Sequence, residues 1–414
     1  MGIFDIRHEL ALERNIVVLG TTTMLATFGN YLWFFFLPSY YQINFGASTS
    51  EIGLVYGAWF LAVSLGTAPA GWLADRIGRK KVIVISGLIS SSSILLLAFT
   101  MNFLVAAIAY PLSGVGTSFI QISNVMVAET VEKERRGVAF GTFQTFAYVA
   151  AAFSPLIGGA TLLKSNSFFP LFVLGATLTL FATALRWLFL KETLTRESHE
   201  SMTKHTFSQS LKMIFSTKVL LTLLVIYSMY DLLVDQRSFV LPLYAKQVLG
   251  LDSLEQGLFF TVLVGVIAAF RIPSGKLSDR IGRRKTIVIS WIGESVLVYL
   301  IVFAPHGNIS FALFGVAVWM LFGVMDSPAA NAWLGDATEG KARGLQMGTF
   351  YSVTALIAFP GAVISGILFS IQPQFPFYAN SILGIIALVL LLFFTKSSAD
   401  LVGGDKSSKD QVSH

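Results

Sequence analysis

Three aspartates lie inside long apolar stretches of this sequence: Asp231, Asp235 and Asp326. An ionisable side chain in the hydrocarbon layer of a membrane is costly, so each of them is a candidate functional residue. Asp231 and Asp235 are one helical turn apart and share a helix face with Tyr227. Two carboxylates this close in a medium of low dielectric constant repel each other, which favours protonation of one of them. We therefore predict that these aspartates carry protons.

Other charged residues within the apolar stretches lead to different predictions. Arg237 either binds an anionic solute or extends to the membrane surface. Arg271 and Glu294 lie on neighbouring stretches at similar depth, and we predict that they form a structural ion pair. No histidine lies in an apolar stretch and the chain has no cysteine, so no metal site is predicted.

The apolar stretches near residues 16–38 and 104–128 contain no deep acidic or basic residue. They offer polar and aromatic side chains that can hydrogen-bond to a solute or stack on it. The predicted solute-binding residues of the whole chain are Asn30, Tyr31, Trp33, Phe34, Gln121, Asn124, Tyr227, Arg237, Trp319 and Phe322. Together with the aspartates they predict a cavity that is polar and aromatic on one side and acidic on the other.

The composition shows which elements must position these residues. Of the 414 residues, 54% are hydrophobic and only 13% are charged, whereas a soluble enzyme carries about 25% charged residues. Uncharged runs of about 20 residues predict membrane-spanning helices. The predicted spans are 16–38, 51–73, 82–101, 104–128, 138–161, 168–190, 219–241, 255–277, 286–304, 309–333, 345–369 and 375–396. The predicted fold class is an all-α membrane protein.

The positive charges predict the orientation of these spans. The segments that share one side of the membrane with both chain ends hold 24 of the 29 Lys and Arg residues, whereas the opposite loops hold only Lys164 and Lys246. Positive charge accumulates on the cytoplasmic side, so both ends are predicted to be cytoplasmic in a multi-pass protein of the cell membrane. The net charge of +6 is spread over short gaps between spans, so it does not predict nucleic-acid binding.

The chain also repeats itself once. The segment from Gly71 to Lys81 returns 204 residues later as Gly275 to Lys285, and the segment from Glu129 to Phe143 returns 207 residues later. Two features at nearly one offset predict two six-helix halves in parallel orientation. The predicted parts are 1–190, a linker at 191–218, 219–396 and a tail at 397–414. In the linker Phe207, Leu211 and Ile214 share a helix face, which predicts a helix on the cytoplasmic membrane surface.

The repeated loop has a physical reading of its own. Gly71 and Gly78 permit a close backbone approach and a tight turn. Asp75 can accept hydrogen bonds from the exposed amides of a neighbouring helix start. The basic residues of the loop, Arg76, Arg79, Lys80 and Lys81, can face anionic lipid.

The pattern G-x-x-x-D-R-x-G-R-[RK]-[RK], present in both copies of this loop, resembles the signature loop of the major facilitator superfamily of secondary transporters. The resemblance implies two six-helix bundles related by a pseudo-two-fold axis along the membrane normal, with spans one, four, seven and ten around a central cavity. It also implies that the loop latches the halves in the outward-open state. The implied gate comprises Gly71, Asp75, Arg76, Gly78, Arg79, Glu129 and Arg136 with Gly275, Asp279, Arg280, Gly282, Arg283, Asp336 and Arg343.

Two further motifs bear on the kind of transporter. Ser154-Pro155-Leu-Ile-Gly158-Gly159 is similar to an element of the family's drug/proton antiporters, with serine in place of its first glycine. The buried arginine that those antiporters usually carry in span four is missing, because Tyr110-Pro111 precedes Gly114 there.

We predict a proton-coupled transporter with alternating access that exports a cationic or amphiphilic solute by proton antiport. The alternative is a proton symporter for a small organic acid or other metabolite. No Walker A sequence occurs, so neither ATP nor another cofactor is predicted. All five histidines lie in termini or loops and no nucleophile–base group is recognisable, so an enzyme is not expected. The predicted partners are a small solute, protons and the lipid bilayer, and the predicted state is a monomer.

Overall fold

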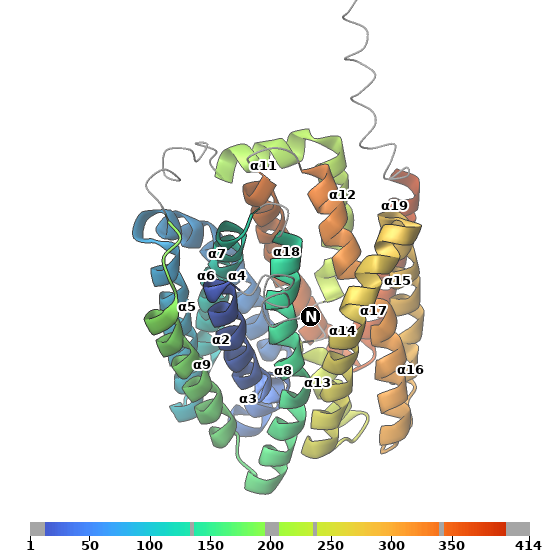
Figure 1. The fold of residues 1–414 in the computed structure, drawn as a ribbon. Coiled ribbons are helices and arrows are strands. Elements are labelled where there is room, and N and C mark those ends of the chain that lie inside the picture. The colour runs from blue at the N-terminus through green and yellow to red at the C-terminus, as the bar shows by residue number, and fades with distance from the viewer. Residues whose placement is uncertain (1–12, 133–135, 195–206, 235–237, 339–342, 395–414) are drawn as a thin grey trace, which may run out of the picture.

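The computed structural model of the chain describes residues 13–132, 136–194, 207–234, 238–338 and 343–394, which fold into helices without a strand (Figure 1). Ten of these helices are long and apolar enough to cross a membrane. The helices are α2 Arg14–Tyr31, η1 Phe34–Phe36, α3 Leu37–Phe45, α4 Thr49–Ile77, α5 Arg79–Phe99, α6 Phe103–Ile120, α7 Ile122–Thr130, α8 Arg136–Ser165, α9 Phe169–Phe189, α11 Phe207–Ser216, α12 Lys218–Val234, α13 Val240–Gln247, α14 Ser253–Ile281, α15 Arg283–Leu297, α16 Tyr299–Val302, α17 Ile309–Ala337, α18 Arg343–Ile371 and α19 Phe375–Phe394.

Four predicted spans are divided between two or more helices. The spans 104–128 and 286–304 are interrupted only at Gln121 and at Val298. The predicted span 16–38 is divided into α2, η1 and α3, and the predicted span 219–241 is divided into α12 and α13 on either side of residues 235–237. Neither break was predicted, although Pro38 lies in the first turn of α3 and Asp235, Gln236 and Arg237 interrupt the apolar run of the second stretch. Breaks of this kind expose backbone groups where a membrane helix lines a cavity.

The helix pairing repeats between the N-terminal half, α2 to α9, and the C-terminal half, α12 to α19 (Figure 1). In the N-terminal half α4 and α5 both pack on α6, and α2 packs on α8 and α9. In the C-terminal half α14 and α15 both pack on α17, and α12 packs on α18 and α19. The halves meet through α4 with α18 and through α8 with α14, which are again equivalent pairs.

Capping sequences that repeat at the 204-residue offset explain why α4 and α14 begin in the same way. Ser48 and Glu51 form a capping box at the start of α4, and Asp252 and Glu255 form the same box at the start of α14. Each box follows a glycine with positive φ, Gly46 at 66° and Gly250 at 70°. The sequence Leu-Pro-x-Tyr also occurs at the start of both α3 and α13. This further feature of the two-fold repeat was not predicted.

Helix α11 lies across one end of the bundle (Figure 1), which we call the linker end; the opposite end, with α3 and α13, is the far end. A helix in the linker was predicted, but its apolar side is only partly available to a membrane surface. Ile214 is buried in a core of the C-terminal half, and α11 packs on α12 and α18.

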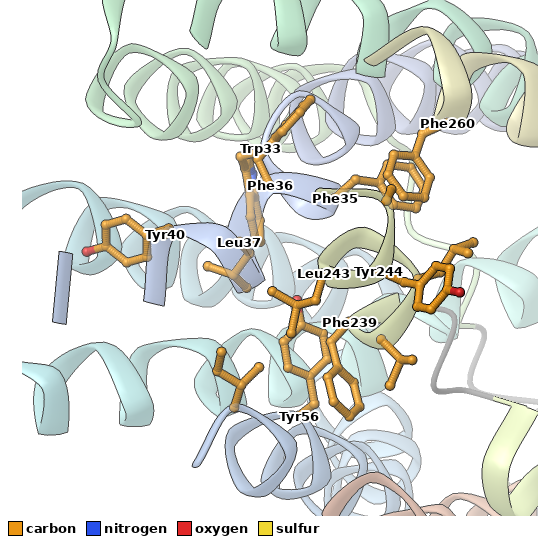
Figure 2. Close-up of a cluster of buried hydrophobic side chains, with 14 of the residues drawn as sticks. Trp33, Phe35, Phe36, Leu37, Tyr40, Tyr56, Phe239, Leu243, Tyr244 and Phe260 are labelled. Atoms are coloured by element: carbon orange, nitrogen blue, oxygen red, sulfur yellow. The ribbon is translucent and has the colours of Figure 1, made fainter. Parts of the chain in front are cut away.

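The hydrophobic cores differ between the two ends. At the far end one core contains residues of both halves, and Figure 2 shows Phe35 beside Phe260 and Tyr56 beside Phe239. Toward the linker end there are two separate cores. One contains only N-terminal residues, such as Ile16 and Met126, and the other contains only residues of α11 and the C-terminal half, such as Trp291 and Trp333.

Candidate functional site

The far end is closed by direct backbone contact between the halves. A Cβ atom at Gly53 of α4 would lie 2.6 Å from the carbonyl oxygen of Ala362 in α18. A Cβ atom at Gly159 of α8 would lie 2.2 Å from the carbonyl oxygen of Ser253 in α14. Real Cβ contacts are not this short. These glycines therefore permit a distance between the helix backbones that no other residue permits.

Side chains complete this closure. The rings of Phe35 and Phe260 stack with centroids 4.0 Å apart (Figure 2). Gln247 donates a hydrogen bond to Gln42 at 2.8 Å across the interface of α3 and α13. Such contacts remove apolar surface from solvent and fix the relative position of the two halves.

The same helices do not touch at the linker end. A Cβ atom at Gly71 of α4 or at Gly348 of α18 would meet no atom within 4 Å, and at Gly275 of α14 it would lie 3.9 Å from Pro328 of the same half. The close approach predicted at Gly71 is therefore absent from this conformation. The reason is that the two halves are separated there and have independent cores.

The repeated loop of the N-terminal half forms an ionic network within that half. Arg79, whose side chain is 1% exposed, donates to Asp75 at 2.6 Å and to Glu129 at 3.2 Å. Thr193 donates to the other oxygen of Glu129. Glu192 accepts the backbone amides of Arg79 at 2.9 Å and of Lys80 at 3.1 Å. This corrects the role predicted for Asp75, because Glu192 satisfies the exposed amides at the start of α5.

Gly78 fits the predicted tight turn, with φ of 102°, and a side chain there would also collide with Glu192. Its counterpart Gly282 has φ of 95°. Arg76 lies over the ring of Trp72 at 4.2 Å. For Arg136 and Arg343, the side chains are outside the described part of the structure.

The repeated loop of the C-terminal half forms a more open network. Arg283 pairs with Asp279 one turn away and with Asp336 at 3.6 Å, and its side chain is 22% exposed. Arg280 is exposed beside it. The two predicted gates thus each join residues of a single half, and no ion pair among the described side chains crosses between halves.

The C-terminal half also holds a buried acidic cluster between α12, α15 and α17. Glu294 is 3% exposed and accepts a hydrogen bond from the hydroxyl of Tyr230. Asp326 is partly exposed and accepts a hydrogen bond from the Trp291 indole at 3.0 Å. Gly323, one turn before Asp326 on α17, lies directly against the Glu294 carboxylate, so the two acids occupy the same part of the half.

Close packing and aromatic rings hold this cluster in place. Trp291 stacks on Tyr230 with centroids 4.2 Å apart and meets the edge of Tyr227 at 5.6 Å. A side chain at Gly293 would collide with Phe322, and one at Gly323 would collide with the Glu294 carboxylate. The glycines therefore bring α15 and α17 close enough for the two acids to share one environment.

The contacts described for Glu294 are with α12 and α17. The pairing of Glu294 with Arg271 stays a prediction, since depth along a span does not show which way a side chain faces. Asp326, Tyr230 and Trp291 lie 32, 64 and 3 residues from Glu294 in the chain, and only folding brings them together.

Three of the predicted proton and anion residues lie in or just after α12. The backbone of Asp231 lies in α12, but its side chain is outside the described part of the structure, as are Asp235 and Arg237 altogether. Trp319, predicted to touch solute, is 2% exposed and donates to the backbone oxygen of Glu294 at 3.2 Å. Tyr227 is 7% exposed. In this conformation Trp319 and Tyr227 pack around the acidic cluster and help to hold it in place.

The N-terminal half places its predicted solute residues unevenly. Asn30, Tyr31 and Phe34 are partly exposed at the break after α2. Trp33 is 3% exposed and packs against Tyr110 and Phe172 inside its own half, so a solute cannot reach it in this conformation. At the start of α7, Asn124 donates to Gln121 at 2.9 Å.

Comparisons with known proteins agree with this architecture. The sequence profile of the Major Facilitator Superfamily matches residues 19–270 and 236–411. The chain belongs to the Major Facilitator Superfamily. As a member it is a multi-pass membrane transporter and not an enzyme, and transporters of this superfamily carry small solutes.

Relatives within the superfamily are distant. An uncharacterized MFS-type transporter of Methanocaldococcus jannaschii is 27% identical over 93% of this chain and 96% of its own length. The multidrug resistance protein MdtG of Serratia proteamaculans is 30% identical over 59% of this chain, which spans 60% of that relative. Among solved structures, the nucleoside transporter NupG has a TM-score of 0.71 at 12% identity, with 95% of this chain and 100% of that chain covered.

Proposed function

We propose that this transporter is driven by protons and exports a cationic or amphiphilic solute in exchange for them. The observation that carries the proposal is the cluster of Glu294 and Asp326 inside the C-terminal half, whose hydrogen-bond donors Tyr230 and Trp291 stack on each other. Membrane-embedded acids that face a bundle interior characterise proton relays. The partial matches to proteins named for multidrug resistance support the solute class.

The cluster has the parts that a proton carrier needs. The partly exposed Asp326 can exchange a proton with water, whereas the buried Glu294 can hold one away from water. Burial penalises two charges side by side, so the pair favours the loss of one proton at a time. The Tyr230 hydroxyl can stabilise a charged Glu294, and the Trp291 indole can stabilise a charged Asp326.

In this proposal the linker end faces the cytoplasm, as the distribution of Lys and Arg predicts, and the cell membrane is the site of action. The described conformation, closed at the far end, is then open to the cytoplasm. Rocking of the halves would open the far end and close the linker end around one site. One chain contains both halves, so a monomer is sufficient.

The solute would lie between the acidic cluster and the polar, aromatic break after α2. Asn30, Tyr31 and Phe34 supply hydrogen bonds and ring contacts from the N-terminal half. Asp231 and Asp235 remain proposed proton carriers, and Arg237 remains the proposed anion contact of an organic-acid symporter.

The test separates proton coupling from solute binding. Purified protein in liposomes is given an outward or an inward pH gradient, and the movement of tetraphenylphosphonium, a lipophilic cation, is recorded. We expect wild-type protein to move the cation against its gradient. Asp326→Asn and Glu294→Gln should abolish this uphill transport, because an amide keeps the shape and cannot titrate. Exchange of labelled for unlabelled cation, which needs no net proton movement, should persist.

Glu132→Gln is the matched control, since it removes an exposed carboxylate outside the cluster. Full uphill transport in both cluster variants would reject the coupling role of Glu294 and Asp326. A proton-driven current for small carboxylates and none for the cation would replace antiport by symport of an organic acid.

A further inference from the structure

A cavity of about 300 Å³ lies at the far end between the two halves. It is bounded by α3 and the end of α8 on one side and by α13 and the start of α14 on the other. Its polar lining consists of Ser39, Asn44, Asn166 and Ser167 from the N-terminal half and Lys246, Ser253 and Gln256 from the C-terminal half. This volume is at the small end of the range of sites for small molecules.

Lys246 gives the cavity a positive charge. It is partly buried, and no carboxylate of the described residues lies within ion-pair distance of it. The acids at the start of α14, Asp252 and Glu255, instead accept each other's backbone amides in the capping box. Burial lowers the pKa of Lys246 from its ordinary value, as expected for a cation that lacks an anionic partner.

Two polar side chains in the lining have unmet hydrogen-bonding capacity. Ser39 and Gln256 are each 2% exposed, and neither the Ser39 hydroxyl nor Gln256 Oε1 has a hydrogen-bond partner among the described residues. The amide nitrogen of Gln256 already donates to the backbone oxygen of Leu251 at 2.9 Å. Gln256 Oε1 therefore needs a donor, such as a hydroxyl group.

The repeat shows that the fold does not require this polar lining. The residues 204 positions from Lys246, Gln256 and Ser39 are Gln42, Ile52 and Leu243. Ile52 and Leu243 are fully buried in the shared core, and Gln42 is bonded to Gln247. The same local architecture is thus filled by packing on one side of the pseudo-two-fold axis and lined with polar groups and a cation on the other.

We propose that this cavity binds a small hydroxycarboxylate. The ammonium group of Lys246 would hold the carboxylate, and ligand hydroxyls would meet Gln256, Ser39 and the two asparagines. Because the lining comes from both halves, the cavity is complete only when the far end is closed. A bound ligand therefore favours the closed far end and slows its opening. This regulatory site is separate from the acidic cluster and from the break after α2.

The test uses gluconate and sorbitol. At one end of the molecule gluconate has a carboxylate, whereas sorbitol has a hydroxymethyl group. Binding to the purified transporter in nanodiscs is measured by calorimetry. We expect gluconate to bind at least about tenfold more tightly than sorbitol, as a charge-assisted hydrogen bond provides. Lys246→Gln, which installs the residue of the other half, should remove this preference. Gln256→Ile, which likewise installs the residue found in the other half, should lower the affinity for both ligands.

Lys164→Gln is the matched control, since Lys164 is exposed at the same end and does not line the cavity. It should leave gluconate binding unchanged. Spin labels at Met101→Cys and Ser310→Cys, in a chain without native cysteine, report the separation of the halves at the far end. Gluconate should narrow the distribution of distances between the two labels and shift it to the shortest distance seen without ligand.

Several outcomes would overturn the proposal: equal affinity for gluconate and sorbitol, no binding of either, unchanged preference in Lys246→Gln, or longer label distances with gluconate. None of these measurements uses solute transport or a proton gradient. Their failure would therefore leave the proposed proton coupling untouched.

Discussion

The far end and the linker end of this transporter are built from the same long helices but are held in different ways. At the far end one hydrophobic core runs through both halves, and glycines bring α4 against α18 and α8 against α14. At the linker end each half has its own core and its own ionic network. Contacts between the halves therefore fix one end, whereas contacts within each half shape the other.

Helix α4 shows this difference along a single element. Gly53, near its far end, lies against the backbone of α18, whereas Gly71, near its linker end, faces open space. Gly348 of α18 also faces open space. Glycine weakens a helix interior, so its presence at uncontacted positions is explained if these positions come into contact when the linker end closes.

The largest predicted effect is on the far-end contact of α4. Gly53→Val would place its Cβ 2.6 Å from the carbonyl oxygen of Ala362 and 3.1 Å from Gly366. Neither group is the end of a flexible side chain, so the halves must separate, and we expect a cost of about 3 kcal/mol for this conformation. Electron paramagnetic resonance of labels at Met101→Cys and Ser310→Cys should show a longer far-end distance.

Gly71→Val is the control for this variant because it adds the same side chain to the same helix. No atom lies within 4 Å of its Cβ, so the far-end distance should stay at its wild-type value. It should instead hinder closure of the linker end, seen as slower solute exchange. Equal far-end distances in Gly53→Val and wild type would show that the glycine contact does not control closure.

Much of this architecture is accessible from the sequence because membrane helices are limited by length and charge. Ten of the twelve predicted spans have a matching candidate span, and the positive φ angles of Gly78 and Gly282 agree with the predicted turn. The breaks in the stretches 16–38 and 219–241 were not predicted, although a proline lies near the first and charged residues lie at the second. Hydropathy measures where a chain is apolar, and the break depends on packing between the halves.

The candidate site was less predictable for a related reason. Glu294 and Asp326 were both recognised as costly residues in a membrane, but their proximity depends on glycines in α15 and α17. Glu192 was missed as the cap of α5, although it lies in the short stretch after α9 where an acidic residue could meet the loop. A single sequence identifies residue types and depths, whereas neighbours require the helix rotations.

The second prediction compares the two ionic networks of the linker end. The Arg79 side chain is 1% exposed and joins Asp75 and Glu129, whereas the Arg283 side chain is 22% exposed. Removing a buried partner leaves charges uncompensated, so Arg79→Ala should lower the free energy of unfolding by about 2 kcal/mol. Arg283→Ala should lower it by less than about 1 kcal/mol. Thermal unfolding of the purified variants measures the difference.

Arg79→Lys tests the charge within that comparison. A lysine keeps the positive charge but cannot donate to two carboxylates in the planar arrangement of arginine, so its stability should lie between wild type and Arg79→Ala. Equal losses for Arg79→Ala and Arg283→Ala would mean that burial of the N-terminal network does not set its strength.

The smallest predicted effect concerns the stacked rings that join the halves at the far end. Phe35 and Phe260 are nearly parallel, with an interplanar angle of 5° and centroids 4.0 Å apart (Figure 2). A double-mutant cycle of Phe35→Leu and Phe260→Leu should give a coupling energy of about 1 kcal/mol. Each leucine keeps most of the apolar volume, so the cycle isolates the ring contact from simple burial.

The cycle is informative only if it is measured in both conformations. In the far-end-closed state the rings touch and the coupling should be present. In the Gly53→Val background the halves are apart, so Phe35→Leu and Phe260→Leu should become additive. The matched pair Tyr40 and Phe172, whose centroids lie 4.8 Å apart within one half, should keep its coupling in that background. Loss of both couplings would mean that Gly53→Val disturbs the N-terminal half itself, whereas loss of the first alone would show that the far end opens as a contact between two intact halves.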